Sequence, residues 1–231
     1  DNSYWIVTHW CNSNTFATYK LTASGLNITP VNSNIGSVHS GLPNSALGQL
    51  TISDDGKKVV LAIYDAGAFE LFDFDMNTGI ISNPIIIGGW VRAWGTAFSP
   101  NSSVLYVTQW YGPNIIQFNL NAGSPSNIIN SQKIVGSATG PGTNGYHIGY
   151  LELAPDDKIY AAVYNDSFIA VINYPNNLGS VCNVIDNGFY LGGNLSNAGL
   201  CRTVQNQRYY YNQSICQGDS ILIFGNYENS S

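Results

Sequence analysis

Short runs of β-branched, aromatic and other apolar residues follow one another along most of this chain, with polar turns between them. Residues 69–74 and 168–173 are two such runs, and Gly, Asn, Asp and Ser are frequent between the runs. Runs of this length with turn residues at both ends are typical of β-strands. Residues that favour helices are scarce, so the pattern predicts an all-β protein.

The strand pattern repeats along the chain. Three segments align as strand, tight turn and strand: 52–61, 98–107 and 153–161. Glycines open the units at Gly48, Gly95, Gly149 and, we expect, Gly199, a period of about 50 residues. A third strand follows in each unit at 69–74, 115–120 and 168–173, with a further copy at 16–21, and a short fourth strand follows at positions such as 84–87 and 132–135. A four-stranded unit of this length predicts the blades of a β-propeller.

The number of blades in the ring stays open at this point. Calling the strands a to d from the axis outward, residues 4–38 hold b, c and d of one blade, and three complete blades follow. The segment 200–204 resembles an a strand and could close a ring of four blades. Alternatively, the chain is the C-terminal part of a larger ring, which we favour because four blades is the small extreme.

Several stretches carry a family resemblance: 4–9, 34–41, 69–75 with 78–84, and 199–200. Together they resemble secreted surface proteins of Bacteroidetes, in which a WD40-like or YVTN-like propeller precedes adhesin-type modules and a type IX secretion or gliding-associated tail. The resemblance covers about residues 4–205 and implies a propeller that is exported to the cell surface. It also implies an O-glycosylation site at Ser220, within Asp219-Ser-Ile221. Family members usually read Gly-Leu-Pro-Asn where this chain has Gly199-Leu-Cys-Arg202.

Two segments are expected. Residues 1–211 form the propeller region, and residues 212–231 are either a tail strand that packs on the last blade or the start of an Ig-like module.

Charge and cysteine content limit the kinds of partner and the cellular compartment that we expect. Only 10% of the 231 residues are charged and the net charge is −6, so nucleic acid is excluded as a partner for want of clustered Lys and Arg. The apolar runs are too short to span a membrane. Four cysteines without zinc-ligand spacing indicate an oxidising compartment. Four cysteines allow three pairings, and we predict a disulfide between Cys182 and Cys201.

Motifs with known chemistry are weak. Asp73, Asp75 and Asn77 precede Gly79 like a calcium loop, but the glycine is one position late, so a plain turn is favoured. Residues 140–145 match a dinucleotide fingerprint without the helix that it requires. The three histidines, His9, His39 and His147, have no local nucleophile, and no carboxylate dyad is evident among Asp65, Asp166 and Glu152.

Aromatic residues gather at one predicted rim, where the b-to-c turns and the d-to-a loops of a propeller meet. The candidate binding residues are Trp10, His39, Tyr64, Trp90, Arg92, Trp94, Trp110, Tyr111, His147 and Tyr164. Aromatic rings with polar edges stack on sugars or grip peptides, and Arg92 offers a forked donor to a carboxylate.

Two functional classes remain. The first is a non-catalytic surface module, with no cofactor, that binds glycan or protein through this rim or serves as a rigid scaffold, with the rest of its own polypeptide or another chain completing the ring. The alternative is a propeller glycosidase or lactonase-like hydrolase with a carboxylate or calcium site at the channel mouth. The missing motifs favour the first class, a protein that is not an enzyme.

Overall fold

The computed structural model describes residues 3–40, 44, 47–139, 147–200 and 222–225. It confirms the all-β fold class: the strands form four antiparallel sheets, and each sheet is one blade. The strands of the first blade are β1 (Tyr4–His9), β2 (Thr15–Thr22), β3 (Gly25–Leu26) and β4 (Val31–Asn34), with β17 (Leu222–Gly225) paired to β1. The second blade holds β5 (Leu50–Ile52), β6 (Lys58–Ile63), β7 (Ala68–Asp75) and β8 (Ile80–Ile87). The third holds β9 (Ala93–Phe98), β10 (Val104–Gln109), β11 (Asn114–Asn119) and β12 (Lys133–Ser137). The fourth holds β13 (Ile148–Leu153), β14 (Ile159–Val163), β15 (Phe168–Ile172) and β16 (Val184–Tyr190).

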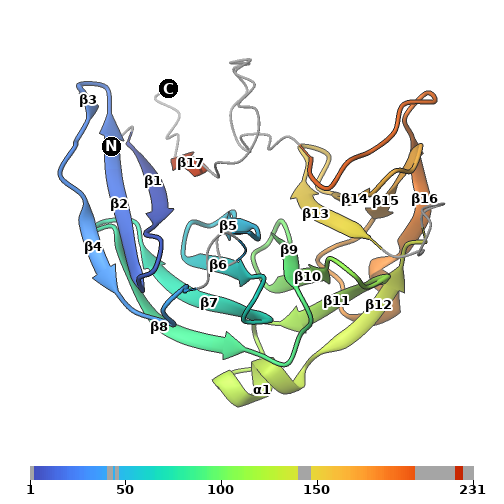
Figure 1. Ribbon diagram of the computed structural model, residues 1–231, viewed down its shortest axis with the longest axis horizontal. Helices are drawn as coiled ribbons and strands as arrows, with labels where there is room; N and C mark the ends of the chain where they lie inside the picture. Colours follow the sequence, from blue (N-terminus) through green and yellow to red (C-terminus); the bar gives the residue numbers. More distant parts are fainter. Residues whose placement is uncertain (1–2, 41–43, 45–46, 140–146, 201–221, 226–231) are drawn as a thin grey trace.

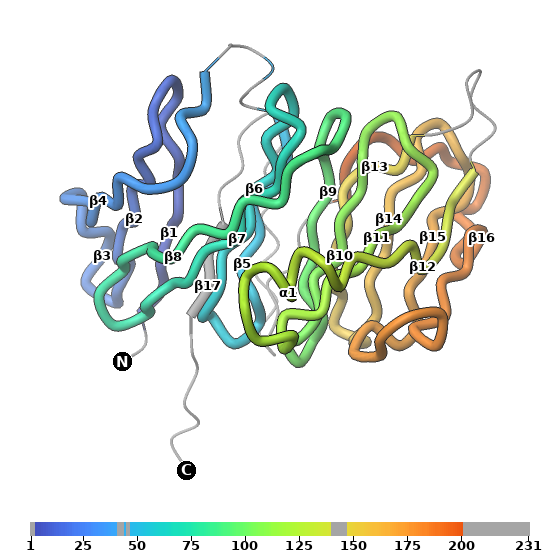
Figure 2. The backbone as a smooth tube through the Cα atoms, turned by 90° about the horizontal axis from the view of Figure 1, so that it is seen from below, coloured from blue at the N-terminus to red at the C-terminus, as the bar shows by residue number. Residues whose placement is uncertain are grey.

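The blades follow one another in chain order along an arc. Figure 1 shows the inner strands β5, β9 and β13 toward the centre and the outer strands β8, β12 and β16 toward the periphery. The first blade and the fourth blade stand at opposite ends of this arc (Figure 1), and Figure 2 shows the four blades side by side from another direction. The predicted order of b, c and d strands in residues 4–38 is therefore confirmed by β1, β2 and the β3–β4 pair.

Apolar side chains seal each blade against the next. One buried cluster joins the first two blades through residues such as Trp5, Phe16 and Phe72. A second cluster joins the second and third blades, and a third cluster joins the third and fourth. Because every blade has two apolar faces, burial of each face depends on a neighbouring blade.

The repeated glycines allow the inner strands to approach closely. A Cβ on Gly95 would lie 2.6 Å from the Gly149 carbonyl oxygen of the next blade, so no larger residue fits between the strands. Gln49 ties three blades together beside these strands. Its side-chain Nε2 donates to Leu151 O at 2.8 Å, and its Oε1 accepts from the N–H groups of Thr96 and Leu151.

The structure differs from the expected turns in the third blade. Where a plain turn was expected after β11, the chain forms the short helix α1 (Pro125–Asn130) at the outer edge of the arc (Figure 1). Ser124 caps this helix by accepting the Asn127 N–H, and Pro125 stands at its first turn, a common helix start. A 3₁₀ turn, η2 (Gly179–Cys182), precedes β16.

The predicted disulfide is not present in the described residues. Cys182 is a fully buried free thiol in the cluster between the third and fourth blades, and its predicted partner Cys201 lies outside the described residues. Burial raises the pKa of the Cys182 thiol. Ser220 also lies outside the described residues, as do residues 201–204 of the predicted closing strand. Within the described ranges, no helix is long and apolar enough to cross a membrane.

Candidate functional site

The turns and loops expected on one rim do meet there. The Trp90 N–H donates to Gly67 O at 2.9 Å, which joins a d-to-a loop to a b-to-c turn in the second blade. The Tyr164 N–H donates to His147 O at 2.9 Å and joins the same two kinds of connection in the fourth blade. Side chains from three blades are thereby brought within reach of one another.

Seven of the ten candidate binding residues form a continuous cluster, which we call the rim site. Its members are Tyr64, Arg92, Trp94, Trp110, Tyr111, His147 and Tyr164, and Tyr150 of β13 joins them against Trp94. Trp94 and Trp110 lie 4.7 Å apart between ring centroids, and Trp110 stacks on His147 at 5.0 Å. Tyr150 was not among the candidate residues, because those were taken from turns and loops and Tyr150 lies within the strand β13.

His147 is held in one tautomer. Its Nδ1 lies 2.6 Å from the Trp110 carbonyl oxygen, which can only accept a hydrogen bond, so the proton of the neutral ring sits on Nδ1. The other nitrogen, Nε2, then carries a lone pair. A neutral imidazole fixed in this way can take a proton from a substrate or a water molecule.

Arg92 places a guanidinium beside this histidine. The guanidinium carbon lies 4.0 Å above the Tyr111 ring and 5.6 Å from the Tyr64 ring, and Tyr111 also contacts His147 at 4.7 Å. No carboxylate among the described residues lies within ion-pair distance of Arg92. Within the described residues, its guanidinium contacts aromatic rings, and such a group can bind an anion.

The backbone of Arg92 adopts a conformation that a non-glycine residue rarely takes. Its φ is +58°, in the left-handed region, and its carbonyl oxygen accepts the Trp110 N–H at 3.0 Å. Such strain costs of order 1 kcal/mol and is common where a side chain must be aimed at a ligand. The peptide groups of Trp110 thus bond to both Arg92 and His147.

Burial raises the pKa of Tyr64, while Arg92 acts to lower it, and the net effect keeps this phenol protonated. The rim site therefore combines flat aromatic surfaces, a guanidinium without a carboxylate partner among the described residues, and an imidazole whose Nε2 is not used by the bond to Trp110. These groups can hold a ring-shaped anionic ligand and move a proton at it.

Three of the candidate residues lie elsewhere. Trp10 is exposed on the first blade, and Trp90 packs between Phe69 and Phe118 in the cluster of the second and third blades. His39 is buried between the first two blades and stacks on His9, with 3.9 Å between ring centroids.

A buried carboxylate that the sequence reasoning missed stands beside these two histidines. Glu70 on β7 is fully buried, and its Oε2 lies 3.7 Å from His39 Nε2, within ion-pair distance but too far for a hydrogen bond. The Ser37 N–H donates to its Oε1 at 2.9 Å. Burial raises the pKa of Glu70, but the contacts with His39 and Ser37 outweigh it and the net pKa is lowered. The signal for this pair was Glu70, one of two charged residues in the apolar run 69–74.

The carboxylates of the calcium-like loop are engaged in turns. Asp73 pairs with Lys58 at 2.7 Å and accepts from Asn83, while Asp75 accepts the Asn77 N–H and the Thr78 hydroxyl. Within the described ranges, no group of three His, Cys, Asp or Glu is arranged to hold a metal ion. Asp166 likewise caps a turn by accepting the Phe168 N–H.

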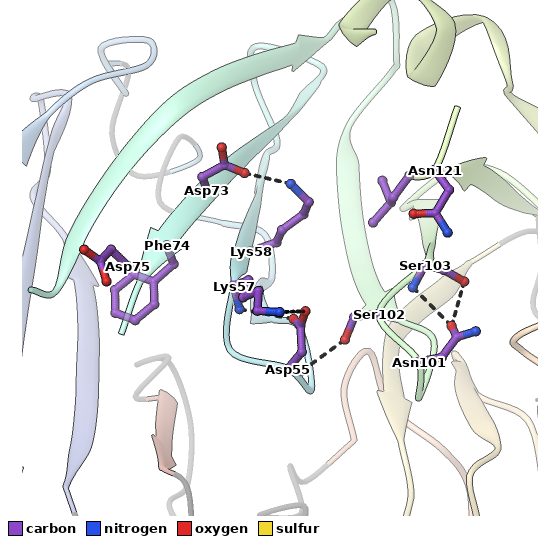
Figure 3. A pocket seen from close by; sticks show the side chains of 11 residues that line it. Asp55, Lys57, Lys58, Asp73, Phe74, Asp75, Asn101, Ser102, Ser103 and Asn121 are labelled. Atoms are coloured by element: carbon purple, nitrogen blue, oxygen red, sulfur yellow. Dashed lines mark hydrogen bonds and ion pairs between the residues drawn. The ribbon is translucent and has the colours of Figure 1, made fainter. Parts of the chain in front are cut away.

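A pocket of about 530 Å³ opens on the opposite rim, between the second and third blades. Figure 3 shows that charged side chains of this pocket form ion pairs, Lys58 with Asp73 and Lys57 with Asp55. The Asp55 N–H donates to the Ser102 hydroxyl across the two blades. Because its charges are paired, this pocket offers less to a ligand than the rim site does.

Comparison with known proteins supports the fold. No protein-family model matches the chain, and no curated protein matches it. A proposed 6-phosphogluconolactonase from Bacteroides uniformis superposes with a TM-score of 0.53 at 15% identity, over 81% of this chain and 57% of that one. A functionally unknown protein from Desulfotomaculum acetoxidans gives 0.49 at 16% identity, over 84% and 56%. The dihydro-heme d1 dehydrogenase NirN gives 0.49 at 14% identity, over 81% and 35%. The chain thus spans little more than half the length, or less, of these structures. The similarity to the Bacteroides uniformis structure supports the β-propeller fold that the four sheets show.

The expectation that the chain is not an enzyme is wrong on this comparison. The structure that matches with a TM-score of 0.53 is named as a proposed lactonase, so propellers of this shape include proteins described as enzymes. The inference from missing motifs fails for a physical reason. A propeller site is assembled from turns of different blades, so its residues are scattered along the sequence and form no local motif.

Proposed function

We propose that this chain is a hydrolase that opens an ester or lactone bond in a small, ring-shaped, anionic substrate at the rim site. The observation that carries the proposal is the hydrogen bond from His147 Nδ1 to Trp110 O, which leaves Nε2 as a base in the same cluster as Arg92, with Tyr111 in contact with both.

Each group has a role in this reaction. The rings of Trp94, Trp110 and Tyr111 provide flat surfaces for a cyclic substrate. Arg92 binds the anionic substituent or the oxyanion that forms. His147 Nε2 takes a proton from water as the water oxygen bonds to the carbonyl carbon. When the ring C–O bond breaks, the protonated His147 returns that proton to the leaving alkoxide, and the products are a carboxylic acid and an alcohol.

The fold comparison gives independent support, because the matching propeller from Bacteroides uniformis is named as a proposed 6-phosphogluconolactonase. Its substrate class, a cyclic ester with an anionic group, is one that the rim site is equipped to hold. We therefore favour a lactone over an open-chain ester.

A lactonase assay tests the proposal. The purified chain is incubated with an aldono-1,5-lactone, with and without a phosphate group, and acid release is followed against the spontaneous rate. We expect the phosphorylated substrate to be preferred and His147→Gln to lower kcat/KM by about 10²–10⁴-fold. Trp10→Ala, which removes an exposed aromatic ring from the first blade outside the rim site, should leave kcat/KM unchanged. Hydrolysis no faster than in buffer, or undiminished in His147→Gln, contradicts the proposal.

We also propose that the reaction takes place outside the cell, as in the secreted surface proteins of Bacteroidetes that the sequence resembles. This step rests on the sequence resemblance alone. Protease treatment of intact cells should degrade the native protein if it is displayed on the surface and should leave it intact if it is retained inside.

A further inference from the structure

The pocket on the opposite rim is a second place where a small molecule can bind. It opens between the second and third blades, and its volume of about 530 Å³ lies within the range of small-molecule sites. Its lining comes from the a-to-b turns of both blades, from β6 and β7, and from the residues that follow β11. It shares no residue with the rim site, so the two can be tested separately.

The two sides of this pocket differ in chemistry (Figure 3). The second blade supplies all of its charged side chains: Asp55, Lys57, Lys58, Asp73 and Asp75. The third blade supplies neutral polar side chains: Asn101, Ser102, Ser103 and Asn121. Each blade adds one apolar side chain, Phe74 from the second and Leu120 from the third. A ligand in the pocket therefore meets charges on one side and hydroxyl and amide groups on the other.

The charges of the second blade already have partners. Lys58 Nζ donates to Asp73 Oδ1 at 2.7 Å, and Asp75 accepts hydrogen bonds from its own turn. Lys57 Nζ lies 3.7 Å from Asp55 Oδ2, within ion-pair distance but too far for a hydrogen bond. A charged ligand would have to compete with these partners. A neutral ligand would leave the ion pairs in place.

A hydroxyl group suits the gap between Lys57 and Asp55. It can accept a hydrogen bond from the ammonium group and donate one to the carboxylate at the same time. Hydrogen bonds to charged groups are roughly twice as strong as those between neutral groups. The second blade thus favours a ligand that carries hydroxyl groups.

The third blade offers hydrogen-bonding groups that face a ligand from the other side. Among the described residues, the Asn121 backbone N–H donates to Asn119 Oδ1, whereas its side-chain amide has no partner. That amide has two N–H donors and a carbonyl acceptor. The Ser102 hydroxyl accepts the Asp55 N–H at 3.1 Å and has a proton of its own to donate. Neighbouring hydroxyl groups of one ligand can use both side chains.

Backbone hydrogen bonds hold the lining in place before a ligand binds. The Phe74 N–H donates to Lys57 O at 2.7 Å, and the Leu120 N–H donates to Ser103 O at 2.9 Å. The bond from the Asp55 N–H to Ser102 joins the two blades across the pocket. A preformed site loses less conformational entropy when a ligand binds.

We propose that this pocket binds a neutral saccharide, whose hydroxyl groups bond to Lys57 and Asp55 on one side and to Asn121 on the other. A saccharide carries several hydroxyl groups on a compact ring and needs no counter-charge. The C–H groups of the ring can lie against the apolar surface of Phe74 and Leu120. This site does not depend on the hydrolase proposed for the rim site.

Saturation-transfer NMR of the full chain tests the class of ligand. The probes are neutral hexoses, deoxyhexoses and N-acetylhexosamines, each alone and in disaccharides. Two matched pairs test charge: N-acetylglucosamine against glucosamine, and galactose against galacturonate. We expect neutral saccharides to bind and the neutral member of each pair to bind more tightly. The absence of binding by every neutral saccharide, or tighter binding of the charged members at Lys57 and Asn121, overturns the proposal.

Substitutions in the pocket test its location. Lys57→Ala should weaken saccharide binding by about tenfold, as expected when a hydrogen bond to a charged group is lost, and Asn121→Ala by about threefold. Lys158→Ala is the matched control, because Lys158 lies 3.8 Å from Asp156 in the corresponding turn of the fourth blade, outside the pocket. Circular dichroism establishes that each variant is folded, and Lys57→Gln serves as a second variant if Lys57→Ala is not.

The same variants separate this site from the rim site. Binding that survives both pocket substitutions but is lost in Trp110→Ala belongs to the rim site and refutes the proposal. An equal loss in Lys158→Ala means a general effect of surface charge and refutes it as well. Lys57→Ala and Asn121→Ala should leave lactone hydrolysis unchanged, so a failure of saccharide binding and a failure of hydrolysis are distinct results.

Discussion

Two histidines in equivalent loops of the propeller differ in burial and in the groups that they contact. His39 and His147 both lie in connections between the outer strand of one blade and the inner strand of the next. His39 is buried against His9 and faces the carboxylate of Glu70. His147 stays partly exposed, bonds to a backbone carbonyl and faces Arg92 across Tyr111.

The difference shows how the partner decides what a histidine can do. The Glu70 carboxylate lies 3.7 Å from His39 and accepts the Ser37 N–H, so the His39 side chain is part of a buried polar contact at the junction of the first two blades. A backbone carbonyl instead fixes a neutral ring with one lone pair free, which suits proton transfer. We therefore expect a structural role for His39, and under the proposed function the role of base falls to His147.

The largest effect is expected from Glu70→Ala. This change leaves the buried His39 Nε2 and the Ser37 N–H without the carboxylate that faces them, so we expect the free energy of unfolding to fall by about 3 kcal/mol. Urea unfolding followed by circular dichroism measures the change. Asp73→Ala is the control: it removes a carboxylate from the half-exposed pair with Lys58 and should cost less than about 1 kcal/mol. Equal losses of unfolding free energy in the two variants would show that the buried pair of Glu70 and His39 contributes no more than the surface pair of Asp73 and Lys58.

Acid should weaken the same junction. The pKa of His9 is lowered from 6.5 to about 4, first by burial and then by repulsion from His39, although Glu70 acts to raise it. Between pH 6.5 and about 4 the unfolded chain therefore binds more protons at His9 than the folded protein does, and stability falls as the pH falls through this window. The lowered pKa of Glu70 acts in the same direction at lower pH, because stability present above its ordinary value of 4.5 is lost as the carboxylate is protonated.

Because His9 is only partly buried, we expect a loss of about 2 kcal/mol between pH 7 and pH 4.5. Urea unfolding at several pH values measures it. His9→Phe removes the titrating ring while keeping its stacking area, and should flatten the pH dependence above pH 4.5. An unchanged slope in this variant would assign the acid sensitivity to other groups.

The sequence predicted the propeller because its signals are local. Each blade repeats the same strands, turns and glycines, so residues such as Gly95 and the run 98–107 identify it without tertiary contacts. The rim was also predictable, since the direction of successive strands decides which turns share an edge. Tyr64, Trp110 and Tyr164 occupy matching places in three repeats for this reason.

Contacts between blades could not be predicted from the sequence in this way. Glu70 meets His39 across a junction of two sheets, and the distance between them depends on how the blades pack. The tautomer of His147 depends on a carbonyl 37 residues away along the chain, and the strained φ of Arg92 has no signature in residue type. The expectation that the chain is not an enzyme rested on missing local motifs, and a site assembled from several blades forms no such motif.

The smallest effect separates strain from chemistry at Arg92. Both Arg92→Ala and Arg92→Gly remove the guanidinium and should reduce lactone hydrolysis equally. Only glycine adopts the φ of +58° without strain, so we expect Arg92→Gly to be more stable than Arg92→Ala by about 1 kcal/mol. Thermal unfolding of the two variants, set beside their kcat/KM values, makes the comparison. Equal stability of Arg92→Ala and Arg92→Gly would mean that the loop relaxes when the side chain is removed. The contacts of Arg92 with Tyr111 and Tyr64 would then be the cause of the left-handed conformation. If Arg92→Ala is the less stable variant, the Trp110 N–H bond to Arg92 O holds the loop, and the rim site is shaped before any ligand arrives.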